Sequence, residues 1–349
     1  MTGLRARGES IRKYILENVG KHPADIAKRT ALHFEVSRQA VNKHLKKLTD
    51  EKCLKESGNT RNRTYVPVIL SEWKKLFYIT PDLAEDVVWR NDIRATLGNL
   101  PANVMNIWHH GFTEMFNNAI DHSGSETIFV TIRKTGTATQ MTIMDEGIGI
   151  FKKIQTAMNL LDERHAILEL SKGKLTTDPK NHSGEGIFFT SRMFDSFDIL
   201  SGGVFLSHEF GKAEDWILER PKSDNGTMVF LGLNNHTSRT AKRVFDLFSS
   251  GEEFGFTKTI VPVVLARYGN DSLISRSQAK RLLARVELFK TVIFDFTNVN
   301  SIGQAFADEI YRVFASQHPE MEILSKGGST QVTQMIARAK AGLAAQEKI

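Results

Sequence analysis

Cysteine is nearly absent from this chain of 349 residues, and long apolar runs are missing altogether. The single cysteine, Cys53, excludes an internal disulfide and any metal site built from several cysteines. No stretch of 18 consecutive apolar residues occurs, so no transmembrane helix is expected. The first 20 residues also lack the apolar block of a secretory signal peptide. These absences predict a cytoplasmic protein, in a compartment that keeps thiols reduced.

Acidic side chains are scarce in one part of the chain. Residues 1–70 hold 7 Asp and Glu against 15 Lys and Arg. The whole chain has 46 basic and 40 acidic side chains, so the remainder has 31 basic and 33 acidic ones and is near neutral. A basic head on a near-neutral body is typical of proteins that bind a polyanion, nucleic acid first and an anionic membrane surface second. The length favours two or three domains.

Three helices and a hairpin are predicted in the basic head. Ile11, Ile15 and Val19 are four residues apart and predict a helix over 8–20 that stops at a glycine. A short helix is expected over 23–30, and Ser37 suits the N-cap of a third over 37–52. Two strand-like runs around the turn signal SGNTRNR complete residues 54–68.

This order of elements resembles a winged helix-turn-helix domain over about 70 residues. The resemblance implies that the third helix enters the major groove of double-stranded DNA and that the hairpin tip touches the backbone or minor groove. The residues expected to bind DNA are Arg38, Gln39 and Asn42 at base edges, Lys43, Lys46 and Lys47 at phosphates, and Arg61 and Arg63 on the hairpin. Protein docking through a solvated basic face is the alternative. Winged helices often read two half-sites, which favours a homodimer.

Four short motifs follow in the middle of the chain. A helix over 112–124 carries Glu114, Asn118 and Asp121 along one polar stripe among apolar neighbours. Such a stripe is costly inside a packed helix unless it meets a ligand or partners. An alternating strand then delivers Asp145 into DEGIG, and the glycine-rich HSGEG precedes an apolar helix. Finally, NGTMVFLGL leads from a turn into a strand.

In this order, the motifs ExxxN, DxGxG, GxG and GT resemble the Bergerat-type nucleotide site of the GHKL superfamily, over roughly residues 100–235. That group contains type II topoisomerases, mismatch-repair ATPases, heat-shock chaperones, histidine kinases and anti-sigma-factor kinases. The resemblance implies ATP and Mg as cofactors, with Asn118 binding Mg and Glu114 acting as general base. It implies that Asp145 accepts a hydrogen bond from the adenine amine, supported by Thr227. The other ATP-binding residues that it implies are Asp121, Gly147, Gly149, Gly184 and Gly186.

Between the second and third motifs, 34 residues predict a helix and then a flexible lid over the phosphates. Lys172, Lys174 and Lys180 are interpreted as solvated lid residues rather than ligand contacts. His122 is interpreted as a structural neighbour of the site. The region 71–108 contains no histidine, so the phosphoacceptor of a histidine kinase is missing and a phosphorelay is not expected.

Alternating strands and helices from residue 257 onward predict a small α/β sheet. The run DFTNVNSIGQAFADEI resembles the central strand, loop and helix of STAS domains, the fold of anti-sigma-factor antagonists, over about 80 residues. The resemblance implies a protein-interaction module. The family's phosphoacceptor serine would stand near Gln304, and Ser301 lies three positions early, so serine phosphorylation is not expected. Lys258 is either an ordinary solvated lysine or a lysine that reaches the terminal phosphate.

The predicted fold class is multidomain α+β, with a GHKL domain built as an α/β sandwich of a mixed sheet and helices on one face. The predicted boundaries are a head at 1–70, a helical connector at 71–100, a nucleotide-binding domain at 101–235, a helical linker at 236–256, a STAS-like domain at 257–335 and a helical tail at 336–349. The predicted function is a DNA-binding regulator controlled by Mg-ATP binding and slow hydrolysis. The main alternative is a protein serine/threonine kinase or partner-switching factor of the anti-sigma type. A further alternative is a DNA-remodelling ATPase clamp akin to mismatch-repair ATPases.

Overall fold

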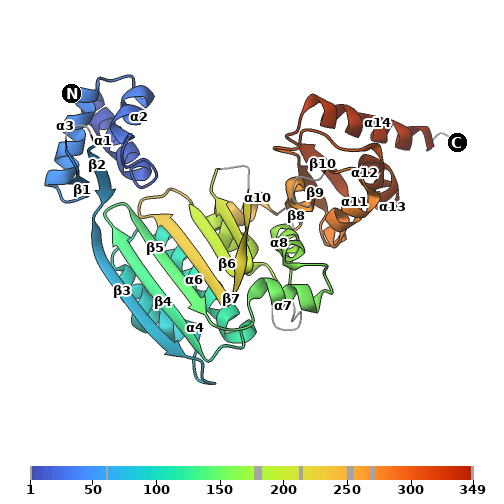
Figure 1. The fold of residues 1–349 in the computed structure, drawn as a ribbon, viewed down its shortest axis with the longest axis horizontal. Helices are drawn as coiled ribbons and strands as arrows, with labels where there is room; N and C mark the ends of the chain where they lie inside the picture. The colour runs from blue at the N-terminus through green and yellow to red at the C-terminus, as the bar shows by residue number, and fades with distance from the viewer. Residues whose placement is uncertain are drawn as a thin grey trace.

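The computed structural model describes residues 2–59, 62–176, 183–211, 215–249, 255–267 and 272–346. Helices and several sheets form a multidomain α/β molecule, arranged as three parts in chain order (Figure 1). We call them the head (residues 2–67), the central unit (69–249) and the C-terminal unit (255–346). Figure 1 shows the head and the C-terminal unit at opposite ends of the central unit.

The head contains three helices and one hairpin, as predicted. Its elements are α1 (Thr2–Asn18), α2 (Ile26–His33), α3 (Arg38–Asp50), β1 (Leu54–Ser57) and β2 (Thr64–Pro67). Ser37 is the N-cap of α3, because its hydroxyl accepts a hydrogen bond from the N–H of Ala40 at 3.2 Å. Helix α1 begins at Thr2 rather than near Gly8. A single internal glycine costs a helix only about 1 kcal/mol, so it does not end α1.

Residues 69–78 form a strand, β3 (Ile69–Tyr78), where the sequence predicted the start of a helical connector. Trp73, Leu76 and Phe77 have helical spacing, which explains the wrong prediction. In the strand, Phe77 packs inward against Phe116, with ring centroids 5.5 Å apart. Leu76 lies on the open face and is 46% exposed. Helical structure begins only at α4 (Glu85–Val88), which continues through a π-helical turn (Trp89–Ile93) into α5 (Arg94–Leu97).

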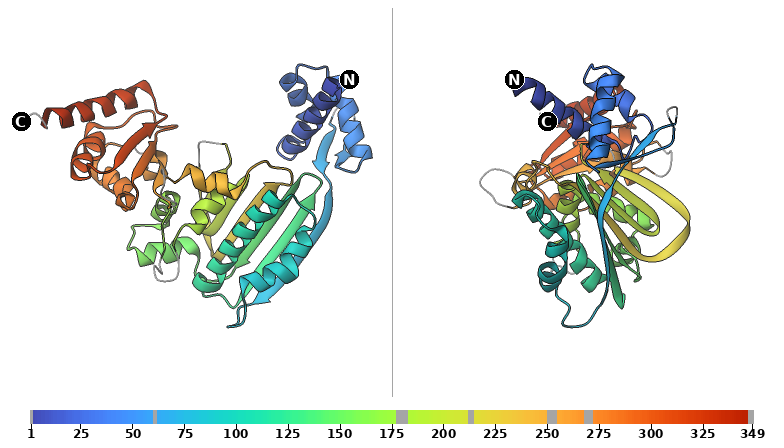
Figure 2. Two further views of the ribbon diagram at one scale, coloured as in Figure 1. Left: turned by 180° about the vertical axis from the view of Figure 1, so that it is seen from behind. Right: turned by 90° about the vertical axis from the view of Figure 1, so that its left-hand side faces the viewer.

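The central unit is built on a five-stranded sheet with the order β3-β4-β5-β7-β6. The other strands are β4 (Thr127–Thr135), β5 (Ala138–Asp145), β6 (Ser196–Glu209) and β7 (Asp215–Asn234). Each neighbouring pair is antiparallel, so the predicted mixed sheet is wrong. Hairpin connections such as β4–β5 reverse the chain and produce antiparallel neighbours. Helix α6 (Ala102–His122) and the α4–α5 segment cover one face of the sheet (Figure 2). The other helices are α7 (Ile150–Ala157), α8 (Glu163–Lys172) and α9 (Gly186–Met193).

The C-terminal unit follows α10 (Ala241–Leu247) and has a three-stranded parallel sheet with the order β10-β9-β8. Its strands are β8 (Lys258–Pro262), β9 (Thr291–Asp295) and β10 (Glu322–Lys326), and its helices are α11 (Arg276–Leu283), α12 (Gln304–Asp308), α13 (Ala315–Gln317) and α14 (Thr330–Gln346). The predicted boundary at 335/336 falls inside α14. Because α14 buries Val332, Ile336 and Ala339, this helix belongs to the unit and is not a separate tail.

Buried apolar side chains form one cluster in the head and a second that runs through the other two units. The second cluster crosses between the units through aromatic rings. Phe256, just before β8, lies with its ring centroid 4.5 Å from that of Phe188 on α9 and 5.0 Å from that of Phe289. The central and C-terminal units are therefore packed as one body, whereas the head has its own core.

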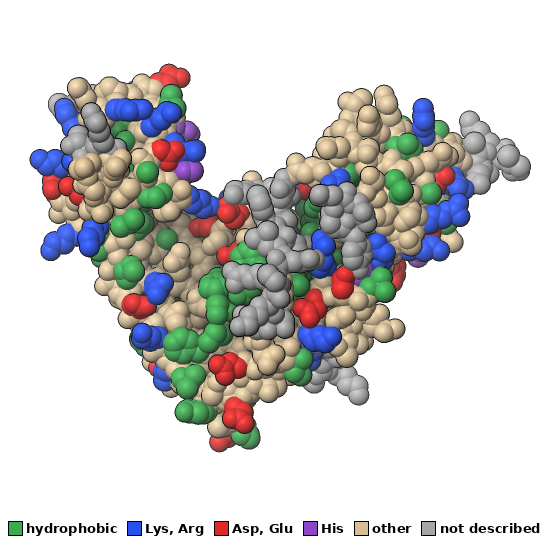
Figure 3. Space-filling model, in the orientation of Figure 1, with side chains coloured by type: hydrophobic (Ala, Val, Ile, Leu, Met, Phe, Trp, Pro, Cys, Tyr) green, Lys and Arg blue, Asp and Glu red, His purple; other side chains and the backbone are tan. Residues whose placement is uncertain are grey.

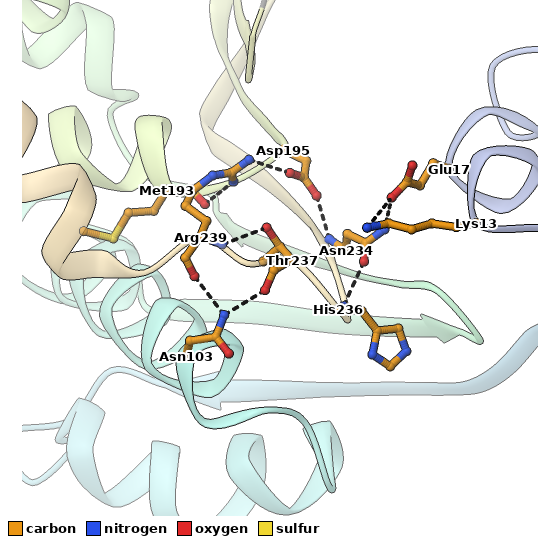
Figure 4. Close-up of polar contacts among 9 residues, drawn as sticks. All are labelled: Lys13, Glu17, Asn103, Met193, Asp195, Asn234, His236, Thr237 and Arg239. Carbon is orange, nitrogen blue, oxygen red and sulfur yellow. Dashed lines mark hydrogen bonds and ion pairs between the residues drawn. The ribbon is translucent and has the colours of Figure 1, made fainter. Parts of the chain in front are cut away.

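Polar contacts, rather than a shared core, join the head to the central unit (Figure 4). The Asn234 side-chain amide on β7 donates to Glu17 of α1 at 3.4 Å. Lys21 Nζ lies 2.6 Å from Glu209 Oε2, with the two side chains 62% and 26% exposed. An ion pair exposed to this degree contributes at most about 1 kcal/mol and is screened by salt. The head is therefore held weakly against the central unit.

Candidate functional site

The central unit contains a cavity of about 270 Å³ bounded by α6, α7, the last turn of α8, the start of α9 with the residues before it, and strands β5, β6 and β7. Its polar lining residues are Glu114, Asn117, Asn118, His122, Ser123, Asp145, Lys153, Thr176, Ser183 and Thr227. Its apolar wall includes Ile143, Ile150, Ile154, Ile199 and Val229. The lining thus combines apolar side chains with a few polar ones, the composition expected of a small-molecule site.

Helix α6 supplies the polar side chains of one wall. Glu114, Asn118 and His122 are spaced by four residues and therefore share one helix face, while Phe112 and Phe116 are buried in the core. Asp121, predicted on the same face, is exposed and does not line the cavity. Asp121 lies one residue before the end of α6. Helical spacing alone does not explain its exclusion, because Met115 and Asn118 are also three residues apart and both line the cavity.

Asp145 lines the cavity where β5 finishes, two residues after Ile143 of the apolar wall. The residue is 7% exposed, and burial raises the pKa of its carboxyl above the ordinary value, although backbone N–H groups of Gly147 and Thr227 oppose the shift. The N–H of Gly147 donates to Asp145 Oδ1 at 3.0 Å. Thr227 faces Asp145 across the β5–β7 pair, and its hydroxyl accepts from the N–H of Ile150 at 3.0 Å. A carboxylate is thereby fixed at the base of an apolar pocket.

The predicted glycines divide into two groups. Gly184 and Gly186 line the cavity, and a Cβ on Gly186 would lie 1.9 Å from Glu114 Oε2. Gly147 and Gly149 do not line it. A Cβ on Gly147 would meet the Ser123 carbonyl oxygen at 2.0 Å, so this glycine lets two backbone segments approach each other. Gly149 takes a positive φ of 88° at the start of α7.

The base of the predicted lid is packed against the C-terminal unit. Leu175 and Thr176 line the cavity, and the N–H of Leu175 donates to the Gly184 carbonyl at 3.0 Å. Residues 177–182, including Lys180, lie outside the described residues. Lys174, just before Leu175, donates to the Leu288 carbonyl at 2.9 Å. The described part of the lid is thus attached to both the cavity and the C-terminal unit.

Lys172 is fully buried, so the interpretation of this residue as a solvated lid lysine is wrong. Its ammonium lies 2.7 Å from Glu169 Oε1 and donates to the carbonyls of Arg281 at 3.0 Å and Ala284 at 2.7 Å. Arg285 completes the group, with Nη1 donating to Glu169 Oε2 at 2.9 Å. Burial lowers the pKa of Lys172, and Glu169 opposes that shift. We call Lys172, Glu169 and Arg285 the lid clamp.

Lys258 and Ser301, in the C-terminal unit, are not among the lining residues of the cavity. Lys258 begins β8 and is not among the lining residues, so its contact with a phosphate stays a prediction. Helix α12 begins at Gln304, and Ser301 lies in the loop before it and is exposed.

The candidate DNA-binding residues of α3 share its exposed side. Arg38, Gln39, Asn42, Lys43, Lys46 and Lys47 are all exposed, while Val41, Leu45 and Leu48 are buried. Lys and Arg side chains are visible over the head in Figure 3. Arg63 is exposed next to β2 and lies 3.5 Å from Glu56, and Arg61 lies outside the described residues. The side of α3 is thus open to a partner, and DNA binding through it stays a prediction.

Sequence reasoning missed the role of Lys153 and the apolar wall. Lys153 lines the cavity from α7, and its ammonium donates to the His122 carbonyl at 2.8 Å. The amphipathic spacing of Ile150 and Ile154 after DEGIG was a signal for this wall. The same helical pattern could have placed Lys153, which comes one residue before Ile154, next to this wall.

Comparison with known families gives a match in the C-terminal unit. Residues 278–327 match the family described as STAS-like domain of unknown function (DUF4325), a stretch that runs from α11 to the end of β10. No curated protein matches the chain. The C-terminal unit therefore contains a STAS-like domain, in agreement with the prediction. In the part of the chain that the structure describes, no helix is long and apolar enough to cross a membrane.

Proposed function

We propose that the central unit is a GHKL-type domain that binds Mg-ATP in the cavity. The observation that carries this proposal is the convergence of six predicted residues from four separate motifs. Glu114, Asn118, Asp145, Gly184, Gly186 and Thr227 line one cavity although they are spread over residues 114–227. The antiparallel sheet with helices on one face is compatible with the α/β sandwich of that superfamily.

The polarity of the cavity indicates how ATP would lie. Adenine fits the apolar end, where Asp145 accepts from its exocyclic amine and Ile150 and Ile154 contact its faces. The phosphates then extend toward Asn118 and the Gly186 end of α9, whose N-terminal N–H groups favour anions. Guanine carries a carbonyl where adenine carries the amine, so the Asp145 carboxylate would reject it.

The donor set at the polar end suits Mg²⁺. Asn118 and Glu114 offer oxygen atoms there, and the described residues contain no cluster of three or more His, Cys, Asp or Glu that could hold a metal. Mg²⁺ usually takes one or two protein oxygens and completes its shell with phosphates and water. When bound, the ion would neutralise charge on the phosphates. Glu114, one helical turn from Asn118, is placed to act as the general base toward water.

The proposed biological role is a regulator that changes its hold on DNA with its nucleotide state. Such control requires that ATP bind the two DNA-affinity states unequally. Two features support it: the head is attached by weak polar contacts, and the lid clamp links the cavity to the STAS-like domain. The exposed basic side of α3 supplies a winged-helix-type DNA surface.

Calorimetry on the full-length chain tests the nucleotide site. We expect Mg-ATP to bind the wild type and Glu114→Ala, and Asp145→Ala to lose binding. Asp246→Ala, at an exposed position on α10, is the matched control. Normal ATP binding by Asp145→Ala would contradict the assignment. The control of DNA binding is tested by the fluorescence anisotropy of a labelled duplex, which measures its affinity for the protein with ADP and with a non-hydrolysable ATP analogue. Equal affinities in the two nucleotide states would exclude such control.

A second candidate function is a protein serine/threonine kinase or partner-switching factor of the anti-sigma type. The observation that favours it is the STAS-like match at residues 278–327 in the same chain as the cavity. Incubation with ATP labelled on the γ-phosphate separates the two functions, because a kinase transfers the label to protein and an ATPase releases it as phosphate.

A further inference from the structure

Lys153 lines the cavity from α7. It lies on the first turn of α7, between Ile150 and Ile154 of the apolar wall, and it contacts the end of α6 through the His122 carbonyl at 2.8 Å. His122 and Asn118 line the cavity from the same face of α6. The ammonium is therefore at the end of α6, one turn beyond Asn118, which the proposed binding mode places at the phosphates.

Other lysines near the cavity are committed elsewhere. Lys172 is held by Glu169 and two carbonyls in the lid clamp. Lys174 donates to the Leu288 carbonyl and lies over the rings of Phe256 and Phe289, at 5.7 and 4.8 Å from their centroids. Among the lining residues that the structure describes, Lys153 is the one lysine or arginine. A polyphosphate in this cavity would meet no other permanent cation from those residues.

The ammonium of Lys153 is also suited to bind a phosphate oxygen in place of a water molecule. Of its three N–H donors, the His122 carbonyl takes one. Partial burial lowers the pKa of Lys153, and the nearby Asp121 carboxylate opposes that shift. A partly desolvated ammonium loses less hydration when it binds an anion, so the contact with a phosphate is favoured. The side chain is half-buried and held in place from one side, which reduces the entropy lost on binding.

We propose that Lys153 is the protein cation that binds the diphosphate portion common to ADP and ATP. The inference rests on the proposed function, because it takes the cavity to be the nucleotide site. The alternative is a purely structural role, in which Lys153 satisfies the last carbonyls of α6 near Asp121. The two roles differ in what they predict for adenosine, which has the base and sugar but no phosphate.

Calorimetry with adenosine and with ADP, each with and without magnesium, distinguishes the roles on the full-length protein. The variants are Lys153→Met, Lys153→Arg and the matched control Lys152→Met, whose exposed side chain lies on the adjacent position and contacts Gln155 at 3.2 Å. We expect Lys153→Met to weaken ADP about 10- to 100-fold, the range for one charge-assisted hydrogen bond, and to leave adenosine within twofold. Lys153→Arg should keep part of the ADP affinity, and Lys152→Met should match the wild type. Circular dichroism checks that each variant is folded.

Three outcomes would overturn the inference alone: equal weakening of adenosine and ADP by Lys153→Met, no weakening of either, or a loss of ADP affinity that occurs only when magnesium is present. If the wild type binds adenosine and ADP and Lys153→Met behaves in one of these ways, the role of Lys153 is wrong but the proposed nucleotide site stands. A wild type that binds neither ligand would overturn the proposed function, and this inference with it.

Discussion

Replacing Lys172 with Met should strongly destabilise the joined central and C-terminal units. The ammonium has 0% side-chain exposure, and it contacts Glu169 at 2.7 Å and the carbonyls of Arg281 and Ala284 at 3.0 and 2.7 Å. Removing one partner of a buried ion pair costs about 3–5 kcal/mol. Arg285 still pairs with Glu169 at 2.9 Å in the variant, so the carboxylate keeps one cation. The two carbonyls lose a donor, and we therefore expect a loss of about 3–4 kcal/mol.

Urea denaturation followed by circular dichroism measures that loss as a lower midpoint at an unchanged slope. Lys242→Met is the matched control, because Lys242 pairs with Asp246 on the surface with side chains 83% and 56% exposed. Its midpoint should stay at the wild-type value. A Lys172→Met midpoint within error of the control would refute the argument that the buried ammonium fastens the two units. The double variant Lys172→Met with Glu169→Leu should lose less than the sum of the single variants, because the two residues interact directly.

Three further predictions concern the cavity and the head. Gly186→Ala should displace the flexible Glu114 carboxylate, since the new Cβ would lie 1.9 Å from its Oε2. ATP turnover should therefore fall about 100-fold at near-normal ATP affinity. Unchanged turnover would count against Glu114 as the base. Because burial raises the pKa of Asp145, its carboxylate is protonated at a higher pH than an ordinary aspartate. Adenosine affinity should therefore fall as the pH is lowered through that raised pKa, and a titration of Asp145→Asn should show no such dependence. Lys46→Ala should weaken duplex binding and lower the slope of log affinity against log salt by about 1, and an identical slope would remove Lys46 from the phosphate contacts.

The cavity was predictable from sequence where short motifs carry fixed local geometry. A four-residue spacing on a helix places Glu114 beside Asn118 whatever surrounds them, and a strand that ends in DEGIG places Asp145 at the end of β5, in the cavity wall. Asp121 shows the limit of the same reasoning. Helical spacing groups Asp121 with Asn118, yet Asp121 is exposed near the end of α6 and does not line the cavity, so spacing alone does not decide which residues reach it.

Two features could not be predicted because they depend on distant partners. Strand β3 is an edge strand with one face open, so its side chains lack the strict alternation of a buried strand, and Trp73, Leu76 and Phe77 imitate a helix. The burial of Lys172 depends on the segment that ends at Arg285, which lies far along the chain and packs against it only in the folded protein. A lysine in a polar sequence context is usually solvated, and only tertiary structure reveals the exception.

The junction between the head and the sheet has a mechanical consequence. Only Val68 separates the end of β2 from the start of β3, so there is no slack tether at this point. The register of β3 against β4 shifts between Ile69 and Ser71, and such a bulge is where a strand bends most readily. Movement of the head would therefore be taken up first by bending at this bulge. The strand beyond the bulge lies only two hydrogen-bonded ladders away from β5, which ends at Asp145 in the cavity wall.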